Sequence, residues 1–381
     1  MVQPFSIDIP DDALRDLQQR LDRTRLPRSM VRDGGDDGIA IETVRRLMDH
    51  WRDGFDWREQ ERRLNRLPHF KAEIDGLDIH FVHQRGVGPA PLPLIVTHGW
   101  PGTFAEMERI LPLLTDPGAH GGDPSDAFDV VVPSLPGYGF SQAPERAGIG
   151  SRAVARLWRQ LMAGLGYARF GAQGGDIGAG VSLWLAREAS EALVGAHLNY
   201  IPGSYRPNVD ATAPALTDDE QAFLARAARF SAEEGAYAAL HATKPQTLAV
   251  SLADSPAGLA AWMAEKFVAW SDRDETAGGI GFDTILTHVA LHWFAGDAAA
   301  PLRLYKENRL DPLVFASDER VEAPIGVAVF PRELPMPPRS WVERVFDVRQ
   351  WTPMPKGGHF AALEQPELLA RNVRAFFGPL R

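Results

Sequence analysis

Apolar side chains near the start of the chain recur three and four residues apart. Leu14, Leu17 and Leu21 follow this spacing, and residues 41–51 repeat it. On a helix, such spacing gathers the apolar side chains on one face, which then packs against another element. The pattern therefore predicts an N-terminal helical segment over residues 1–67.

The hydrophobic pattern then changes to a period of two. Residues 70–74 and 77–81 alternate between apolar and polar on either side of Asp75-Gly76, and Asp-Gly between two such runs is a strong signal of a β-hairpin. Alternation of apolar runs with helical stretches is typical of a mostly parallel sheet flanked by helices. The predicted strands of this kind are residues 94–97, 128–132, 168–173, 193–199, 325–330 and 345–354.

One long stretch interrupts this alternation. Between residues 202 and 301 the strand signal disappears, and the chain is Ala-rich with an apolar-faced helical run at residues 259–270. We interpret this stretch as a helical cap inserted into an α/β core. The predicted organisation is a helical segment (1–67), a core (68–201 and 302–381) and a cap (202–301).

The composition narrows the range of partners. With 40 Lys and Arg against 50 Asp and Glu, the net charge is −10, whereas a nucleic-acid partner would require a basic face. The absence of cysteine excludes disulfides, thiolate zinc sites and cysteine nucleophiles. No apolar stretch approaches the roughly 18 residues of a membrane-spanning helix, and residues 1–10 do not resemble a signal peptide. We predict a cytoplasmic protein without a membrane partner.

The strongest chemical signal is Gly174-Gly175-Asp176-Ile177-Gly178, between a predicted strand and a predicted helix. Small residues around the central position allow a tight turn that exposes a nucleophile in a strained conformation. The central residue here is Asp176, and the chain has no Gly-x-Ser-x-Gly motif. A glycine turn whose Asp only caps the helix is the alternative.

A carboxylate nucleophile suits displacement at an sp³ carbon, because it needs no deprotonation at neutral pH. The product of that displacement is a covalent ester. Cleavage of the ester by water then requires a general base and an oxyanion hole. If Asp176 is a nucleophile, the chain must supply both.

His359 and Glu333 are the best candidates for the base and its supporting acid. His359 follows the last predicted strand and Glu333 follows the penultimate one, which gives the α/β-hydrolase order of nucleophile, acid and histidine. The acid would hold the imidazole tautomer and stabilise the imidazolium. Asp311 and Asp318 precede the penultimate strand and are weaker candidates. A structural histidine and a surface glutamate are the alternatives.

Two backbone amides form the predicted oxyanion hole. His98-Gly99-Trp100-Pro101 follows an earlier predicted strand, where this fold places one donor, and the residue after the nucleophile supplies the other. The donors would be the amides of Trp100 and Ile177. Without the other motifs, the first of these segments indicates only a buried turn.

Taken in order, these motifs resemble those of the microsomal-type epoxide hydrolases, a group that includes juvenile hormone epoxide hydrolases and soluble bacterial enzymes. The resemblance covers essentially the whole chain. It implies an α/β-hydrolase fold and the hydrolysis of a small-molecule epoxide to a vicinal diol. The motifs that carry it are Phe55-Asp56-Trp57-Arg58, His98-Gly99-Trp100-Pro101-Gly102, residues 132–141, Gly174-Gly175-Asp176-Ile177-Gly178 and Gly357-Gly358-His359-Phe360-Ala361-Ala362. Separately, the chain has neither a Gly-x-Gly-x-x-Gly fingerprint nor a phosphate-binding P-loop, so we predict no cofactor.

The resemblance also implies roles for single residues. Asp176 matches the nucleophile of the family, Glu333 its acid and His359 its base. Two cap tyrosines, Tyr237 and Tyr305, match the pair that binds and protonates the epoxide oxygen. A phenol suits that task because it stays protonated at neutral pH and can donate a hydrogen bond. By helical pattern alone, both tyrosines are packing residues.

Ile177 departs from the family pattern, because tryptophan is common after the nucleophile in those relatives. Its backbone amide is still available, but the pocket wall changes, so no substrate preference is implied. Vertebrate microsomal members carry an N-terminal membrane anchor, and none is expected here. The natural epoxide, its enantiomer and a role in detoxification or secondary metabolism stay open.

Several alternatives remain. A haloalkane dehalogenase would need two side chains that donate hydrogen bonds to the halide, and it would give Tyr237 and Tyr305 no task. A non-catalytic ligand-binding relative would have no use for an intact triad.

His288 and His292 have a spacing that can bind a metal, but no third ligand or His-Glu-x-x-His motif accompanies them. We predict no metal. A homodimer is compatible with the sequence, which leaves the oligomeric state open.

Overall fold

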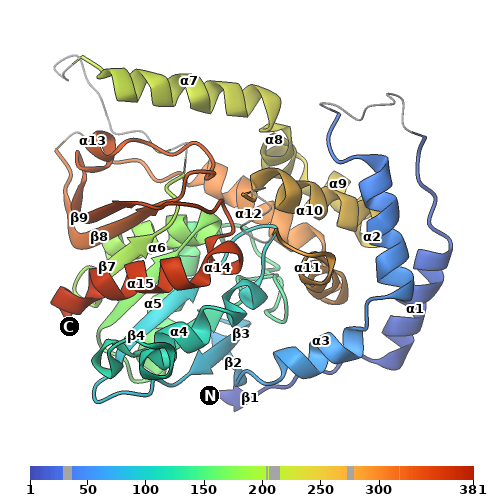
Figure 1. The fold of residues 1–381 in the computed structure, drawn as a ribbon, viewed down its shortest axis with the longest axis horizontal. Helices are drawn as coiled ribbons and strands as arrows, with labels where there is room; N and C mark the ends of the chain where they lie inside the picture. Colours follow the sequence, from blue (N-terminus) through green and yellow to red (C-terminus); the bar gives the residue numbers. More distant parts are fainter. Residues whose placement is uncertain (29–36, 203–204, 206–214, 273–278, 317) are drawn as a thin grey trace.

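The computed structural model describes residues 1–28, 37–202, 205, 215–272, 279–316 and 318–381. Within these residues, one nine-stranded sheet runs through the molecule in the order β1-β2-β3-β5-β4-β6-β7-β8-β9 (Figure 1). Its strands are β1 (Gln3–Pro4), β2 (His69–Ile74), β3 (Leu77–Gln84), β4 (Leu92–Thr97), β5 (Phe128–Pro133), β6 (Phe170–Gly174), β7 (Leu193–Leu198), β8 (Val321–Val329) and β9 (Phe346–Pro353).

Antiparallel pairing is confined to the end of the sheet that contains β1, β2 and β3. Strands β2 and β3 form the predicted hairpin, with Ile74 opposite Leu77. Its turn residues Asp75 and Gly76 have φ values of 52° and 76°, as expected for the type I′ turn that Asp-Gly favours. From β5 to β9 every neighbouring pair is parallel, so the carboxyl ends of these strands meet at one edge.

Helices cover both faces of the sheet (Figure 1). Helices α5 (Ser151–Gly164) and α6 (Asp176–Glu188) pack together on one face, and α4 (Leu111–Thr115) and α15 (Pro366–Phe377) pack on the other. Because both faces are covered, all residues of the interior strand β7 are buried. The predicted mostly parallel sheet with flanking helices is confirmed. The short helices α13 (Arg339–Val342) and α14 (Ala361–Glu364) follow β8 and β9.

The described residues between β7 and β8 contain helices and no strand. These helices are α7 (Asp218–Glu233), α8 (Ala236–Thr243), α9 (Pro245–Asp254), α10 (Pro256–Trp270), α11 (Phe282–Phe294) and α12 (Ala299–Leu310). Helix α12 packs against α8 and α9, and α10 packs against α9 and α11. Helix α12 continues across the predicted boundary between residues 301 and 302. Across the described parts of the chain, no helix has the length and apolarity needed to cross a membrane.

The N-terminal segment (residues 1–67), here called the brace, contains α1 (Asp11–Asp22), α2 (Ile41–Asp53) and α3 (Trp57–Leu64). The apolar face predicted for α1 buries Leu17 and Leu21. Helices α1 and α2 contact α10, and α2 and α3 contact α11 (Figure 1). The brace therefore packs along the outer side of the cap helices.

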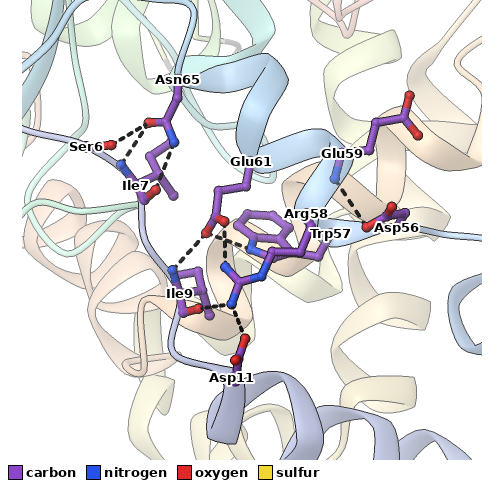
Figure 2. Close-up of polar contacts among 10 residues, drawn as sticks. All are labelled: Ser6, Ile7, Ile9, Asp11, Asp56, Trp57, Arg58, Glu59, Glu61 and Asn65. Carbon is purple, nitrogen blue, oxygen red and sulfur yellow. Dashed lines mark hydrogen bonds and ion pairs between the residues drawn. The ribbon is translucent and has the colours of Figure 1, made fainter.

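The carboxylate of Glu61, in α3, binds the first residues of the brace through hydrogen bonds (Figure 2). Its Oε1 accepts hydrogen bonds from the backbone N–H of Ile9 at 2.8 Å and from Trp57 Nε1 at 3.1 Å. Its Oε2 accepts a hydrogen bond from Arg58 Nη1 at 2.5 Å. These charge-assisted bonds hold the extended residues ahead of α1 against α3.

Three further contacts join the brace to the rest of the molecule. The ring of Trp57 packs against Phe294 of α11, with ring centroids 4.9 Å apart. His50 Nε2 lies 2.6 Å from a carboxylate oxygen of Asp283, also in α11. The third contact is an ion pair of 2.7 Å between Arg63 Nη1 and Glu108 Oε2. The brace thus links the cap to the segment that follows β4.

Candidate active site

Asp176 lies in the sharp turn between β6 and α6, at the carboxyl edge of the sheet. Strand β6 ends at Gly174, and α6 begins at Asp176 itself. The φ of Asp176 is +46°, a left-handed conformation that strains a residue with a side chain. The turn approaches β4 so closely that a Cβ on Gly178 would lie 2.0 Å from the carbonyl oxygen of Thr97. This is the tight turn that the glycine pattern predicts.

The structure brings Asp176, Glu333 and His359 together. His359 Nε2 lies 3.5 Å from Asp176 Oδ2, and His359 Nδ1 lies 2.5 Å from Glu333 Oε1. These residues follow β6, β8 and β9, whose carboxyl ends share one edge of the sheet. The side chains of His359 and Glu333 are 3% and 2% exposed, and that of Asp176 is 16% exposed. Glu333 therefore holds His359 from the interior, and Asp176 is the most accessible of the three.

Opposing effects set the charge of His359. Burial alone lowers the pKa of the imidazole, but the carboxylates of Glu333 and Asp176 raise it well above its ordinary value through coulombic attraction and hydrogen bonding. Because Glu333 accepts a hydrogen bond at Nδ1, that nitrogen carries a proton and Nε2 faces Asp176. The two carboxylates therefore favour the charged form of His359, and the loss of either negative charge would lower its pKa.

The two predicted oxyanion donors adjoin Asp176. The backbone N–H of Trp100 donates a hydrogen bond of 2.8 Å to Asp176 Oδ1. Ile177 lies in the first turn of α6, where N–H groups have no acceptor within the helix and the helix dipole is positive. One donor therefore already binds the carboxylate, and the other belongs to a helix end that favours negative charge.

His288 and His292, whose spacing resembles a metal site, contact the loop after β4. His288 Nδ1 lies 2.8 Å from Thr103 Oγ1, and His292 Nε2 donates a hydrogen bond of 3.2 Å to the carbonyl oxygen of Pro101. Burial lowers the pKa of His288 to about 3 and that of His292 to about 4, so both rings are neutral. The described residues contain no cluster of three metal-ligating side chains. These contacts position the loop that carries Trp100.

Tyr237 of α8 and Tyr305 of α12 meet at the indole of Trp100. Tyr237 stacks on that ring at a centroid distance of 5.4 Å, and Tyr305 approaches it edge-to-face at 6.2 Å. Burial raises the pKa of both phenols well above the ordinary value, and the charge of Asp176 adds to the effect. The hydroxyl of Tyr305 is buried and interacts with that of Tyr237, which couples the pKa values of the two phenols.

Comparison with known proteins gives a consistent result along the whole chain. Residues 2–107 match the model of the epoxide hydrolase N terminus, and residues 93–272 match that of the alpha/beta hydrolase fold. Epoxide hydrolase 1 of Oryctolagus cuniculus is 38% identical, over 99% of this chain and 89% of that protein. Juvenile hormone epoxide hydrolase 1 of Ctenocephalides felis is 34% identical, over 98% of this chain and 84% of that protein. Among solved structures, Aspergillus niger epoxide hydrolase is similar with a TM-score of 0.87 and 33% sequence identity. The match covers 100% of this chain and 97% of that chain. The chain belongs to the epoxide hydrolase family.

Membership of this family confirms two predictions made from the sequence. The fold is the α/β-hydrolase fold, and the chain is an enzyme of the hydrolase class. The alternatives of a haloalkane dehalogenase and of a non-catalytic relative have no comparable support.

The two weaker acid candidates of this epoxide hydrolase have other surroundings than His359. Asp311 follows α12, and its Oδ1 lies 3.7 Å from Arg152 Nη1. Asp318 precedes β8 in an exposed turn. The described contacts of His359 therefore involve Glu333 rather than either aspartate.

Glu364 is a buried residue of the epoxide hydrolase site that no sequence motif singles out. Its carboxylate accepts hydrogen bonds from the backbone N–H groups of Gly358 at 3.1 Å, Phe360 at 2.9 Å and Asp272 at 2.7 Å. The first two residues flank His359, and Asp272 lies just beyond α10. The loop that carries His359 is thereby fixed to the end of α10. Only the folded chain brings these segments together, so a single sequence carries no signal for this contact.

Glu364→Ala is expected to lower the free energy of unfolding by about 3 kcal/mol, because three buried N–H groups lose their acceptor. Chemical denaturation followed by circular dichroism measures this change. Glu367→Ala is the control, since Glu367 is exposed on α15, and it should change the free energy by less than about 0.5 kcal/mol. Equal stability of the two variants would contradict the role assigned to Glu364.

Proposed function

We propose that this epoxide hydrolase converts an epoxide and water into a vicinal diol through a covalent ester on Asp176. The observation that carries the proposal is the position of its two carboxylate oxygens. Asp176 Oδ1 accepts the Trp100 amide at 2.8 Å, and Asp176 Oδ2 lies 3.5 Å from His359 Nε2. One oxygen already has the oxyanion donor that an ester carbonyl requires, and the other is left to act as the nucleophile.

In the first half-reaction, Asp176 Oδ2 attacks an epoxide carbon and the ring C–O bond breaks. The electron pair of that bond goes to the epoxide oxygen, which takes a proton from Tyr237 or Tyr305. The raised pKa of both phenols keeps this proton in place until the alkoxide forms. The product is a hydroxyalkyl ester whose carbonyl oxygen, Oδ1, still faces the Trp100 amide.

Formation of the ester changes the charge around His359. Because Asp176 is no longer negative, one of the two carboxylates that raise the pKa of His359 is lost, and the pKa falls. The proton that His359 then releases restores the tyrosine. The neutral imidazole is thereby ready to act as a general base.

In the second half-reaction, His359 Nε2 takes a proton from water, and the water oxygen attacks the ester carbonyl carbon. The amides of Trp100 and Ile177 stabilise the oxyanion that develops on Oδ1. When this intermediate collapses, the acyl C–O bond of the ester breaks and the imidazolium protonates the departing alkoxide, which gives the diol. The proton left on the Asp176 carboxyl returns to His359, which regenerates the starting state.

A panel of alkyl and aryl epoxides, with chiral analysis of the diols, tests this activity and identifies the preferred substrate class. The wild-type protein is expected to form a diol from at least one of them. Asp176→Ala is expected to form none above the uncatalysed background. Diol formation by that variant at the wild-type rate would overturn the assignment of the nucleophile.

A further inference from the structure

Glu106 is a buried carboxyl group that has no task in the proposed mechanism. It lies in the short 3₁₀ helix η1 (Phe104–Glu108), just after the loop that carries Trp100, and it is 8% exposed. It lines the same cavity as Asp176 and His359. Within the described parts of the chain, its carboxyl makes neither a hydrogen bond nor an ion pair. A buried carboxyl without a protein partner is costly, so another molecule is expected to bind it.

The local backbone directs this carboxyl toward the site. A Cβ on Gly102 would lie 1.2 Å from Glu106 Oε1, so the carboxyl occupies space that a side chain at position 102 would fill. Glu108, in the same helix, instead forms the ion pair with Arg63 of the brace at 2.7 Å. Two glutamates of one short helix therefore differ, because one pairs with a cation and the other faces the cavity.

The charge state of Glu106 suits the binding of a neutral molecule. Burial raises the pKa of its carboxyl to about 8, with His359 lowering it and Asp176 raising it. At neutral pH the group is therefore mostly protonated, with an O–H donor and a carbonyl acceptor. A neutral carboxyl also adds no negative charge beside the oxyanion that must develop on Asp176.

The cavity itself has the size and lining of a water site. Its volume is about 20 Å³, which is room for one water molecule. Gln173 and Asn199 line it together with the groups named above, and Gln173 Nε2 donates a hydrogen bond of 2.8 Å to Asn199 Oδ1. A buried water is stable where several polar groups surround it. This cavity offers such groups directly beside the nucleophile and the base.

We propose that Glu106 binds the water molecule that hydrolyses the Asp176 ester, so that it acts in the second half-reaction only. The inference rests on the proposed ester mechanism. The water donates one hydrogen to His359 Nε2 and the other to the carbonyl oxygen of the Glu106 carboxyl, which directs its lone pair toward the ester carbon. The water proton passes to His359 as the new C–O bond forms, and Glu106 keeps its own proton throughout.

Single turnovers with enzyme in excess, using styrene oxide or 1,2-epoxyhexane as probe, separate the two half-reactions by rapid quench and intact-protein mass spectrometry. In Glu106→Leu, ester hydrolysis is expected to slow by about 10- to 100-fold, because the attacking water is no longer held in position. The rate of alkylation should stay within about 3-fold of the wild-type rate. Glu106→Gln keeps a neutral carbonyl acceptor, so its ester should be hydrolysed at least about 5-fold faster than that of the leucine variant. Glu108→Gln, the matched control in the same helix, should hydrolyse its ester at the wild-type rate.

The outcomes test this inference separately from the ester mechanism on which it rests. An ester that forms in Glu106→Leu and disappears at the wild-type rate overturns the water-binding role and leaves the mechanism intact. Equal slowing in the glutamine and leucine variants also overturns that role, because the carbonyl acceptor would then be insufficient. The lack of any ester in the wild-type protein overturns the mechanism instead. If Glu106→Leu fails to fold, Glu106→Ala replaces it, and the ratio of its alkylation rate to its ester-hydrolysis rate is interpreted in the same way.

Discussion

His359→Gln is expected to be alkylated once and then to stop, with ester hydrolysis slowed by about 10³-fold or more. Glutamine accepts no proton at neutral pH, so the water that attacks the ester loses its general base. The attack of Asp176 on the epoxide needs no base and therefore proceeds. The mass of the epoxide should stay on the protein, where mass spectrometry of the intact chain detects it.

His83→Gln is the matched control for this experiment. His83 Nε2 lies 3.0 Å from Tyr167 Oη, outside the group of residues around Asp176. This variant should turn over epoxide without retaining the adduct. An inert His359→Gln protein that forms no adduct under saturating epoxide would show that His359 acts before the ester forms, contrary to the account given above.

Tyr237→Phe and Tyr305→Phe are each expected to slow alkylation by about 10²-fold, because each removes an O–H group that stabilises the developing alkoxide. Phenylalanine keeps the aromatic packing on Trp100, so the cap should stay in place. Hydrolysis of an ester that has already formed should change less. Single-turnover rates of the two half-reactions measure this difference, and the two effects need not be additive.

Tyr167→Phe controls for the loss of a phenol elsewhere in the molecule. Tyr167 Oη donates a hydrogen bond of 2.7 Å to Asp129, and neither residue contacts the described active-site groups. Its alkylation rate should match that of the wild-type protein. If both cap variants also alkylated at the wild-type rate, Tyr237 and Tyr305 would have no part in opening the epoxide.

Features with local causes were predictable from the sequence. Asp75-Gly76 predicts its hairpin because the turn depends on two residues that tolerate positive φ. The turn at Asp176 is equally local, since it depends on small neighbours and on the strand and helix at its two ends. The candidate acid and base follow from chain order along parallel strands. Tyr237 and Tyr305 are different, because family resemblance rather than helical pattern singled them out.

Features with distant causes were not predictable. Glu364 acts on backbone groups as far away as residue 272, and Glu106 belongs to no motif. For His288 and His292, the lack of a third ligand argued against a metal, but the sequence did not indicate their actual partners near residue 100. In each case the decisive contact joins segments that only the folded sheet and cap bring together. One sequence alone therefore does not indicate such contacts.

The source of the oxygen in the diol tests the covalent mechanism most directly. In a single turnover in heavy-oxygen water with enzyme in excess, the oxygen that opens the epoxide comes from Asp176, and water adds to the ester carbonyl. The account therefore predicts an unlabelled diol and a label in the peptide that contains Asp176. Direct attack of water on the epoxide, with Asp176 as a general base, would give a labelled diol and an unlabelled peptide, and that result would contradict the covalent mechanism.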